Sequence, residues 1–334
     1  MNISKEDYLR MKKKYLMLKL SIKRGGTKKL EYFGGRLIYD FSENKTIYYQ
    51  DLKKKWKFYS NKEGFDLLYL CYKETQKMLK ENYRLIKEKY KNPEEEIKKG
   101  YYIYSKKNSL KKNTNTYGTG EHVTWTAEEY SHLGLQRYYL IVKCFQRFTE
   151  TWGQLERSKS FGLFDNLNSE IDVGTIGGGP GFECLAYEIF FKKYYPNIKC
   201  RFHVLDLEEN WGKYVVLMGP NYNFYQWNMY KNDIYKTVGI KKLDFVMISN
   251  VLVMYMTNEE SYRLIKRLLD NNTKAILINS RSKTIKAKSD LEKYDVKTTN
   301  LLNENDDRQI LFSLKKYYLK EKINNVFPNV PYLK

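Results

Sequence analysis

The second half of the chain alternates between short apolar runs and longer segments in which apolar residues recur every three or four positions. The runs predict buried strands, and the segments between them predict helices. The predicted strands are 173–176, 199–206, 223–228, 243–249 and 273–279, followed by 296–300 and 308–314 as a final antiparallel pair. Strands that alternate with helices predict an α/β fold whose parallel strands present ligands at their carboxyl ends.

The first of these strands runs into a glycine-rich turn that contains Gly177, Gly178, Gly179 and Gly181. A turn of this kind lets the backbone approach a nucleotide-like ligand closely, because a Cβ would block both the turn and the ligand. The dinucleotide-binding fingerprint needs Gly or Ala at its last position, where this chain has Phe182. A pyrophosphate would be crowded by that ring. A glycine turn in a loop that binds nothing is the alternative.

The spacing of Gly177, Gly179 and Gly181 resembles the turn of class I S-adenosylmethionine-dependent methyltransferases. The resemblance covers roughly residues 126–315 and implies a Rossmann-like sheet with helices on both faces. It also implies S-adenosylmethionine as the cofactor, with S-adenosylhomocysteine as the product. Thr175 stands where this family often carries an acidic residue, so a usual contact to the cofactor's amino group is absent or comes from elsewhere.

An acidic residue, Asp206, ends the second predicted strand, 25 residues after Gly181. In nucleotide-binding α/β folds an acid at this place accepts hydrogen bonds from ribose hydroxyls. We therefore expect Asp206 and the adjacent Leu207 to line the cofactor site. The resemblance implies further cofactor contacts after the next two strands, at Asn228, Met229 and Ser249.

Methyl transfer requires few catalytic groups, because the sulfonium already activates the methyl group and the enzyme aligns a nucleophile and manages one proton. Asn250, after the fourth strand, is the candidate to orient the nucleophile, with a helix N-cap as its alternative role. In the family, the segment before the first strand often closes over cofactor and substrate. It supplies His122 as a second catalytic candidate and Gln136 as a cofactor contact; a solvated His is the alternative. The substrate candidates are Trp125, Arg137 and Tyr255.

Positive charge is concentrated in residues 1–116, which hold 30 Lys and Arg against 14 Asp and Glu, a net charge of +16. Residues 117–334 hold 30 basic and 25 acidic residues, a net charge of +5. The excess favours a polyanionic partner, and we expect RNA. Lysine enrichment from an AT-rich genome is the alternative, and the style of residues 1–19 resembles proteins of large AT-rich DNA viruses.

The N-terminal third, residues 1–116, has its own organisation and is expected to be a separate, mostly helical basic region ahead of a methyltransferase domain at 117–334. A basic amphipathic helix is predicted at 4–20, strands at 36–40, 46–49 and 57–59, and a long helix at 63–91. A flexible loop is predicted at 105–120. Thr126 and Glu129 form a capping-box pattern that starts a helix to about residue 157.

Three function classes remain open from these features. A methyltransferase acting on RNA is favoured. A small-molecule N- or O-methyltransferase would use residues 1–116 as a lid. A non-catalytic protein would keep the fold and bind nucleic acid or a partner protein.

Cysteine and histidine usage narrows the expected environment. The four cysteines are scattered and there are three histidines, so no obligatory metal is expected. No apolar run reaches membrane-spanning length and the first residues lack a signal-peptide pattern. A reducing intracellular compartment is expected: the cytoplasm, or a virion or viral factory if the protein is viral.

Overall fold

The computed structural model describes residues 30–32, 35–40, 46–51, 54–59, 62–109, 125–280, 285–302 and 307–314. The predicted helix at 4–20 and His122 lie outside these residues. The chain forms two compact units, one of residues 1–65 with 329–334 and one of residues 66–328.

The first unit contains an antiparallel sheet of four strands in sequential order. Its strands are β1 (Leu30–Tyr32), β2 (Gly35–Asp40), β3 (Thr46–Asp51) and β4 (Lys54–Tyr59). The register pairs Ile38 with Tyr48 and Tyr49 with Trp56. The three strand segments predicted in this part of the sequence are confirmed.

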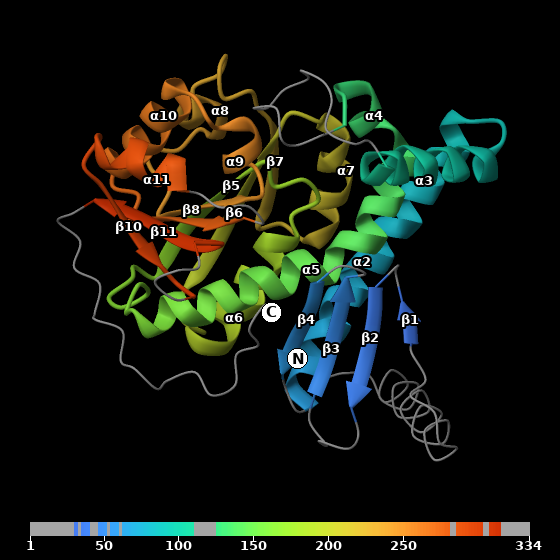
Figure 1. The fold of residues 1–334 in the computed structure, drawn as a ribbon, viewed down its shortest axis with the longest axis horizontal. Coiled ribbons are helices and arrows are strands. Elements are labelled where there is room, and N and C mark those ends of the chain that lie inside the picture. Colours follow the sequence, from blue (N-terminus) through green and yellow to red (C-terminus); the bar gives the residue numbers. More distant parts are fainter. Residues whose placement is uncertain are drawn as a thin grey trace. The chain divides into compact units, whose positions relative to one another are not determined.

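The second unit contains a seven-stranded mixed sheet in the order β10-β11-β9-β8-β5-β6-β7 (Figure 1). Its strands are β5 (Glu170–Ile176), β6 (Lys199–Asp206), β7 (Tyr222–Gln226), β8 (Phe245–Ser249), β9 (Ala275–Asn279), β10 (Val296–Asn300) and β11 (Gln309–Leu314). Strands β5 to β9 are parallel, and β11 is antiparallel to both β9 and β10. The predicted Rossmann-like α/β fold is confirmed, including the final antiparallel pair.

The strand order reverses at β5, which pairs with β6 on one side and with β8 on the other. Successive connections therefore leave the sheet in opposite directions at this point. In open parallel sheets such a switch point leaves a crevice at the carboxyl ends of the strands, where ligands bind. The glycine-rich turn follows β5 at this crevice.

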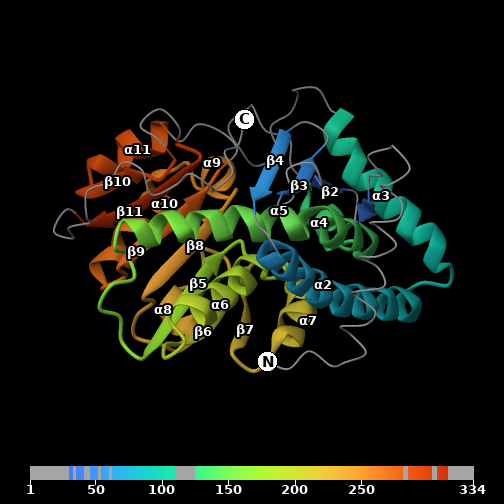
Figure 2. The same ribbon diagram turned by 90° about the horizontal axis from the view of Figure 1, so that it is seen from below.

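Helices cover both faces of this sheet, with α5 and α6 on one side and α8, α10 and α11 on the other (Figures 1 and 2). The helices of the described residues are α2 (Lys62–Lys89), α3 (Pro93–Ser109), α4 (Ala127–Ser131), α5 (Leu133–Ser160), α6 (Phe182–Tyr194), α7 (Gly212–Val215), α8 (Ile234–Val238), α9 (Leu252–Tyr255), α10 (Glu259–Asp270) and α11 (Ile285–Glu292). Two short 3-10 turns are η1 (Glu209–Trp211) and η2 (Val216–Met218).

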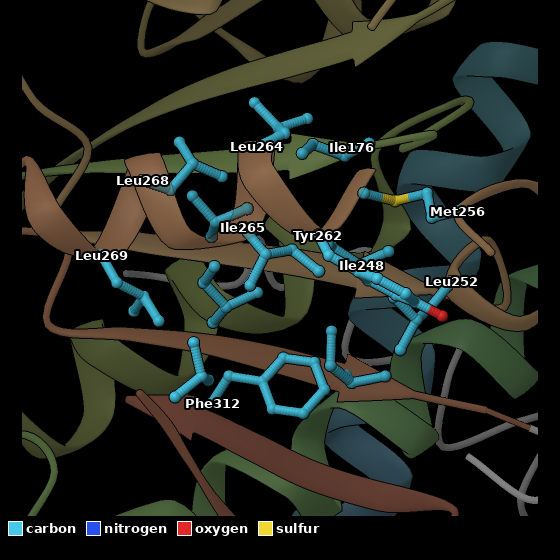
Figure 3. Close-up of a cluster of buried hydrophobic side chains, with 14 of the residues drawn as sticks. Ile176, Ile248, Leu252, Met256, Tyr262, Leu264, Ile265, Leu268, Leu269 and Phe312 are labelled. Carbon is cyan, nitrogen blue, oxygen red and sulfur yellow. The ribbon is translucent and has the colours of Figure 1, made fainter. Parts of the chain in front are cut away.

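The central strands are apolar on both faces because both faces are covered. On one face, Ile176, Ile248 and Phe312 belong to the same buried cluster as Leu264 and Leu268 of α10 (Figure 3). On the other face, Phe245 of β8 lies in edge contact with Phe164, at 5.5 Å between ring centroids, and packs near Tyr187 of α6. The continuous apolar runs in the sequence reflect this two-sided burial.

Helix α5 is attached to the sheet by buried polar contacts. The Gln154 side chain donates to the carbonyl of Ile278 at 2.9 Å, and Asn279 donates to Gln154 at 2.9 Å. Arg157 donates to the Gln309 side chain at 2.6 Å. These bonds fix the angle at which α5 crosses the strands.

The predicted helix from 126 to 157 is not continuous, and this expectation is corrected. It is divided at His132, whose Nδ1 accepts from the amides of Gly134 and Leu135 and so caps α5, while Nε2 lies 2.9 Å from Glu96. An acceptor at Nδ1 requires a neutral ring, and burial lowers the pKa of His132 accordingly. The capping box of Thr126 and Glu129 is confirmed at the start of α4.

The predicted loop at 105–120 is also corrected in part, because α3 extends to Ser109. Helix α3 crosses α5 where Gly100 faces Gly134. A Cβ on Gly100 would lie 1.9 Å from the carbonyl carbon of Gly134, and one on Gly134 would lie 2.2 Å from the oxygen of Glu96. The two backbones touch, which only glycine permits.

Among the helices of the described residues, none combines the length and hydrophobicity needed to cross a bilayer.

Candidate active site

The glycine-rich turn adopts backbone angles that exclude most other residues. Gly177, Gly179 and Gly181 have φ of +64°, +50° and +82°, in the left-handed region. The amide of Gly177 donates to the carbonyl of Leu205 at 2.8 Å, which attaches the turn to the end of β6. Gly181 then begins α6 without any side-chain cap.

The four glycines of the turn differ in what surrounds them. A Cβ on Gly178 would lie 2.1 Å from Thr175 Oγ1, and one on Gly177 would lie 2.5 Å from a methyl group of Val251. A Cβ on Gly179 would meet nothing closer than the Tyr130 hydroxyl at 3.8 Å and the Trp211 ring at 3.9 Å. The turn is therefore packed from below, and at Gly179 a Cβ would fit in ordinary van der Waals contact with Tyr130 and Trp211.

Asp206 joins the turn to the second strand. Its Oδ2 accepts from the amide of Gly179 at 2.9 Å and its Oδ1 from the amide of Glu208 at 3.0 Å. Burial raises the pKa of Asp206 to about 6, against the lowering effect of these backbone donors. A carboxylate offers about four lone-pair positions, so acceptor capacity remains for a ligand's hydroxyl groups.

Aromatic side chains form a wall over the turn. The ring of Tyr130, from α4, lies 5.6 Å from Trp211 and 6.4 Å from Tyr139. Trp125 stacks on Tyr130 with ring centroids 6.1 Å apart. Burial and the nearby charge of Asp206 raise the pKa of Tyr130 well above its usual value, so its hydroxyl stays protonated and able to donate a hydrogen bond.

Polar groups of α5, α6 and β8 lie beside the turn. Arg147 Nε is 3.9 Å from Glu183, and Arg147 Nη1 is 3.6 Å from Glu150. Burial raises the pKa of Glu183, while the charge of Arg147 and a hydrogen bond from Ser249 oppose this. The buried cluster thus places a cation and two carboxyl groups below the point where β5 and β8 end.

Several buried polar atoms around this crevice have no hydrogen-bond partner among the described residues. They include both side-chain amide atoms of Asn250, Nε1 of Trp211, and Nε and Nη1 of Arg147. Asn250 also has a φ of +59°, and its amide donates to the carbonyl of Asn279 at 2.7 Å. Buried polar atoms are normally paired, so this concentration fits a polar ligand that would complete them.

The other residues expected around the cofactor lie at the rim or below the turn. Leu207 is 63% exposed beside Asp206. Asn228 accepts from the amide of Tyr230, and Met229 accepts from Ser261 at 3.8 Å. Thr175 is buried beneath Gly178, where its hydroxyl lies 4.0 Å from the Cys184 thiol.

Three further residues proposed from the sequence have partners in the fold. The Gln136 side chain is buried, donates to the carbonyl of Tyr130 and accepts from the Tyr214 hydroxyl. Arg137 donates to the carbonyl of Leu79. The carbonyl of Tyr255 accepts from the Tyr230 hydroxyl. The structure therefore brings Asp206, the turn and Asn250 together, and places the guanidinium of Arg137, from α5, against α2.

Four residues beside the turn were not predicted from the sequence: Tyr130, Tyr139, Arg147 and Glu183. The only local signal for Glu183 is its place in the first turn of the helix that follows the glycines. The other three come from α4 and α5, and their proximity to the turn depends on how these helices cross the sheet. Within the described part of the chain, no group of three or more His, Cys, Asp or Glu side chains is arranged to hold a metal ion.

Comparison with known proteins gives only distant likenesses. No protein-family model and no curated protein matches the chain. Among solved structures, the chain is similar to the CMeT domain of a citrinin polyketide synthase, with 12% identity, a TM-score of 0.39, and coverage of 56% of this chain and 57% of that one. It is similar to a plantazolicin methyltransferase solved with a substrate analogue and S-adenosylhomocysteine, with 14% identity, a TM-score of 0.36, and coverage of 61% and 81%.

A third likeness is to magnesium protoporphyrin IX methyltransferase from Synechocystis PCC 6803, solved with S-adenosylmethionine. The identity is 15%, the TM-score 0.31, and the coverage 48% of this chain and 78% of that one. With TM-scores below 0.4, these likenesses assign no function to the chain.

Proposed function

We propose that this protein is a class I S-adenosylmethionine-dependent methyltransferase. The observation that carries the proposal is the glycine turn at the switch point of the sheet, held by the bond from the Gly179 amide to Asp206. The fit of the cofactor is supported by the acceptor capacity that remains on Asp206 and by the unpartnered side-chain amide of Asn250 nearby.

Each part of the crevice has a role in this proposal. Asp206 would accept hydrogen bonds from the ribose hydroxyls, and the exposed side chain of Leu207 would lie against the base. The bound cofactor supplies an activated methyl group. The side-chain amide of Asn250 would orient the attacking atom by a hydrogen bond, and the aromatic wall of Tyr130 and Trp211 would exclude water.

We further propose that the acceptor of the methyl group is RNA. The net charge of +16 in residues 1–116 supports it, because polyanion binding gains from counterion release. The alternative is a small-molecule acceptor, with residues 1–116 as a lid, in which case the methylated product would have a low molecular mass. A non-catalytic protein would bind cofactor or RNA without any transfer.

Calorimetry with S-adenosylhomocysteine tests the cofactor site directly. We expect binding to the full chain and severe loss for Gly179→Val. The proposal is overturned if calorimetry detects no heat of binding at millimolar ligand.

The acceptor is tested by transfer of a radiolabelled methyl group from S-adenosylmethionine. Label in acid-precipitable, ribonuclease-sensitive material would support the RNA acceptor, and label only in small molecules would overturn it.

A further inference from the structure

A groove with a volume of about 400 Å³ lies between α3 and α5, away from the glycine turn. Tyr101, Tyr102 and Lys98 line it from α3, and Arg137 and Tyr138 line it from α5. Its base is the crossing of Gly100 over Gly134, where the two backbones touch. Because this crossing leaves no freedom for the helices to approach further, the groove is preformed.

The groove is lined by aromatic rings that other side chains hold in place. Tyr102 is 69% exposed and Tyr101 is 47% exposed, which is unusual for such large apolar side chains. The Tyr101 ring lies 5.0 Å from Tyr138 and 5.9 Å from Tyr102, in edge contact with both. In an edge-to-face contact the edge of one ring meets one face of the other, and Tyr102 is in one of these two contacts, so at least one face of its ring remains for a stacking partner.

A series of ring contacts links the groove to the glycine turn. Tyr138 lies 4.8 Å from Tyr104, which lies 5.2 Å from Trp125. Trp125 stacks on Tyr130, whose hydroxyl lies 3.8 Å from the position of a Cβ on Gly179. A series of packed rings, which includes the buried ring of Tyr104, therefore connects the groove with the proposed methyl-transfer site.

Positive charge lies beside the rings. Lys98 is exposed at the groove and forms no ion pair with any described residue. The guanidinium of Arg137 is the second cation, bound to the carbonyl of Leu79. Exposed aromatic faces beside cations are the combination that binds single-stranded nucleic acid, in which bases stack on rings and phosphates meet Lys or Arg.

We propose that this groove binds single-stranded RNA, with a base stacked on Tyr102 and a phosphate at Lys98. The role of this binding depends on the proposed function: the groove would hold the RNA acceptor while the nucleotide to be methylated reaches the glycine turn. Binding itself does not require cofactor, so the two proposals can fail separately.

The test is fluorescence anisotropy of a labelled oligouridylate with the full chain. Tyr102→Ala should weaken binding at least about fivefold, the effect of losing one stacked base. Tyr102→Phe keeps the ring and should bind within about twofold of the wild type. Lys98→Ala should reduce the slope of log affinity against log salt by about 0.7, the value for one phosphate contact on a single strand.

Lys297→Ala is the matched control, because Lys297 is an exposed lysine of β10 on the sheet edge and should leave the slope unchanged. S-adenosylhomocysteine affinity, measured in parallel, should be the same in all four variants. The proposal is overturned if Tyr102→Ala binds like the wild type, if Tyr102→Phe is as weak as Tyr102→Ala, or if Lys297→Ala changes the slope as much as Lys98→Ala. If RNA binding follows the expected pattern while S-adenosylhomocysteine does not bind, the groove stands and the methyltransferase proposal fails.

Discussion

Two places in this molecule depend on glycine for opposite reasons. At the crossing of α3 and α5, a Cβ on Gly100 or Gly134 would lie about 2 Å from backbone atoms of the other helix, within helices of ordinary φ. At the turn after β5, Gly179 has a φ of +50° and nothing closer than 3.8 Å to the position of a Cβ. The first place needs glycine because two backbones touch there. The second needs glycine for its backbone angle, since a Cβ at that place would make only ordinary van der Waals contacts.

The difference separates a structural glycine from one that serves a ligand. Where protein atoms already fill the space of the missing side chain, glycine contributes to packing. Where glycine is required by its backbone angle at a switch point of a sheet, the turn can bring its backbone close to a bound molecule. Sequence alone shows glycine in both cases, and only the surroundings distinguish them.

The largest expected effect is on stability at the helix crossing. Gly134→Ala should lower the free energy of unfolding by about 3 kcal/mol or more, because the new methyl group meets the rigid backbone of Glu96 rather than a movable side chain. Denaturant unfolding of the full chain measures this loss.

Gly239→Ala is the control for that measurement, since Gly239 has a φ of +75° but nothing within 4 Å of a Cβ. It should cost about 1–2 kcal/mol from backbone strain alone. Equal losses in the two variants would show that the crossing is not tightly packed.

The second expected effect is on ligand affinity at the turn. Gly179→Ala should cost about 1–2 kcal/mol of stability, like Gly239→Ala, since both residues carry the same kind of strain. It should also weaken S-adenosylhomocysteine binding at least about tenfold, because the added methyl group would lie where a ligand would approach the backbone of the turn most closely. Calorimetry of the two variants compares them, and unchanged affinity in Gly179→Ala would contradict a ligand site at this turn.

The third expected effect is a pH dependence set by Asp206, whose pKa is raised by burial to about 6. As an acid with a raised pKa, it favours the folded state when protonated, and this contribution is lost as pH rises from about 4 through about 6. Ligand hydroxyls donate to the carboxylate, so affinity for S-adenosylhomocysteine should fall as pH drops below about 6, by up to about tenfold per pH unit.

Asp206→Asn provides the comparison, because an amide does not titrate. Its affinity should be lower at neutral pH, by about 1.5–3 kcal/mol for the loss of a charged hydrogen-bond partner, and flatter between pH 5 and 7. If the wild-type affinity for S-adenosylhomocysteine does not change across this pH interval, Asp206 takes no part in ligand binding.

The smallest expected effect concerns Thr175, which fills the space beneath Gly178. Thr175→Val keeps the shape and removes a hydroxyl that accepts from the Cys184 thiol at 4.0 Å. Affinity for S-adenosylhomocysteine should stay within about twofold and stability within about 1 kcal/mol. A tenfold loss of affinity would show instead that the hydroxyl contacts the ligand.

The sheet could be predicted from the sequence because its strands are local apolar runs bounded by turns. The glycine turn and Asp206 could be predicted for a similar reason, since backbone angles and strand ends determine their roles. The meeting of Asp206 with Gly179 is a long-range contact, but the order of two adjacent parallel strands already implies it.

The aromatic wall and the buried cluster around Arg147 could not be predicted in this way. Tyr130 and Arg147 reach the turn because α4 and α5 are separated at His132 and because α5 crosses the sheet at a fixed angle. His132 itself is paired with Glu96 across 36 residues. The last turn of α3, rich in Lys, Asn and Ser, resembles a loop locally, and its helical form accompanies the docking of Gly100 on α5.

The helix crossing also bears on how this chain can change during evolution. A boundary at residue 116 would make the preceding segment a module that recombination could add, remove or exchange. Helix α3 does not behave as such a module, because its loss would uncover Gly134 and remove the Glu96 partner of His132. Helices α3 and α5 are therefore expected to be inherited together, and a substitution at either glycine can persist only with a compensating change in the opposite helix.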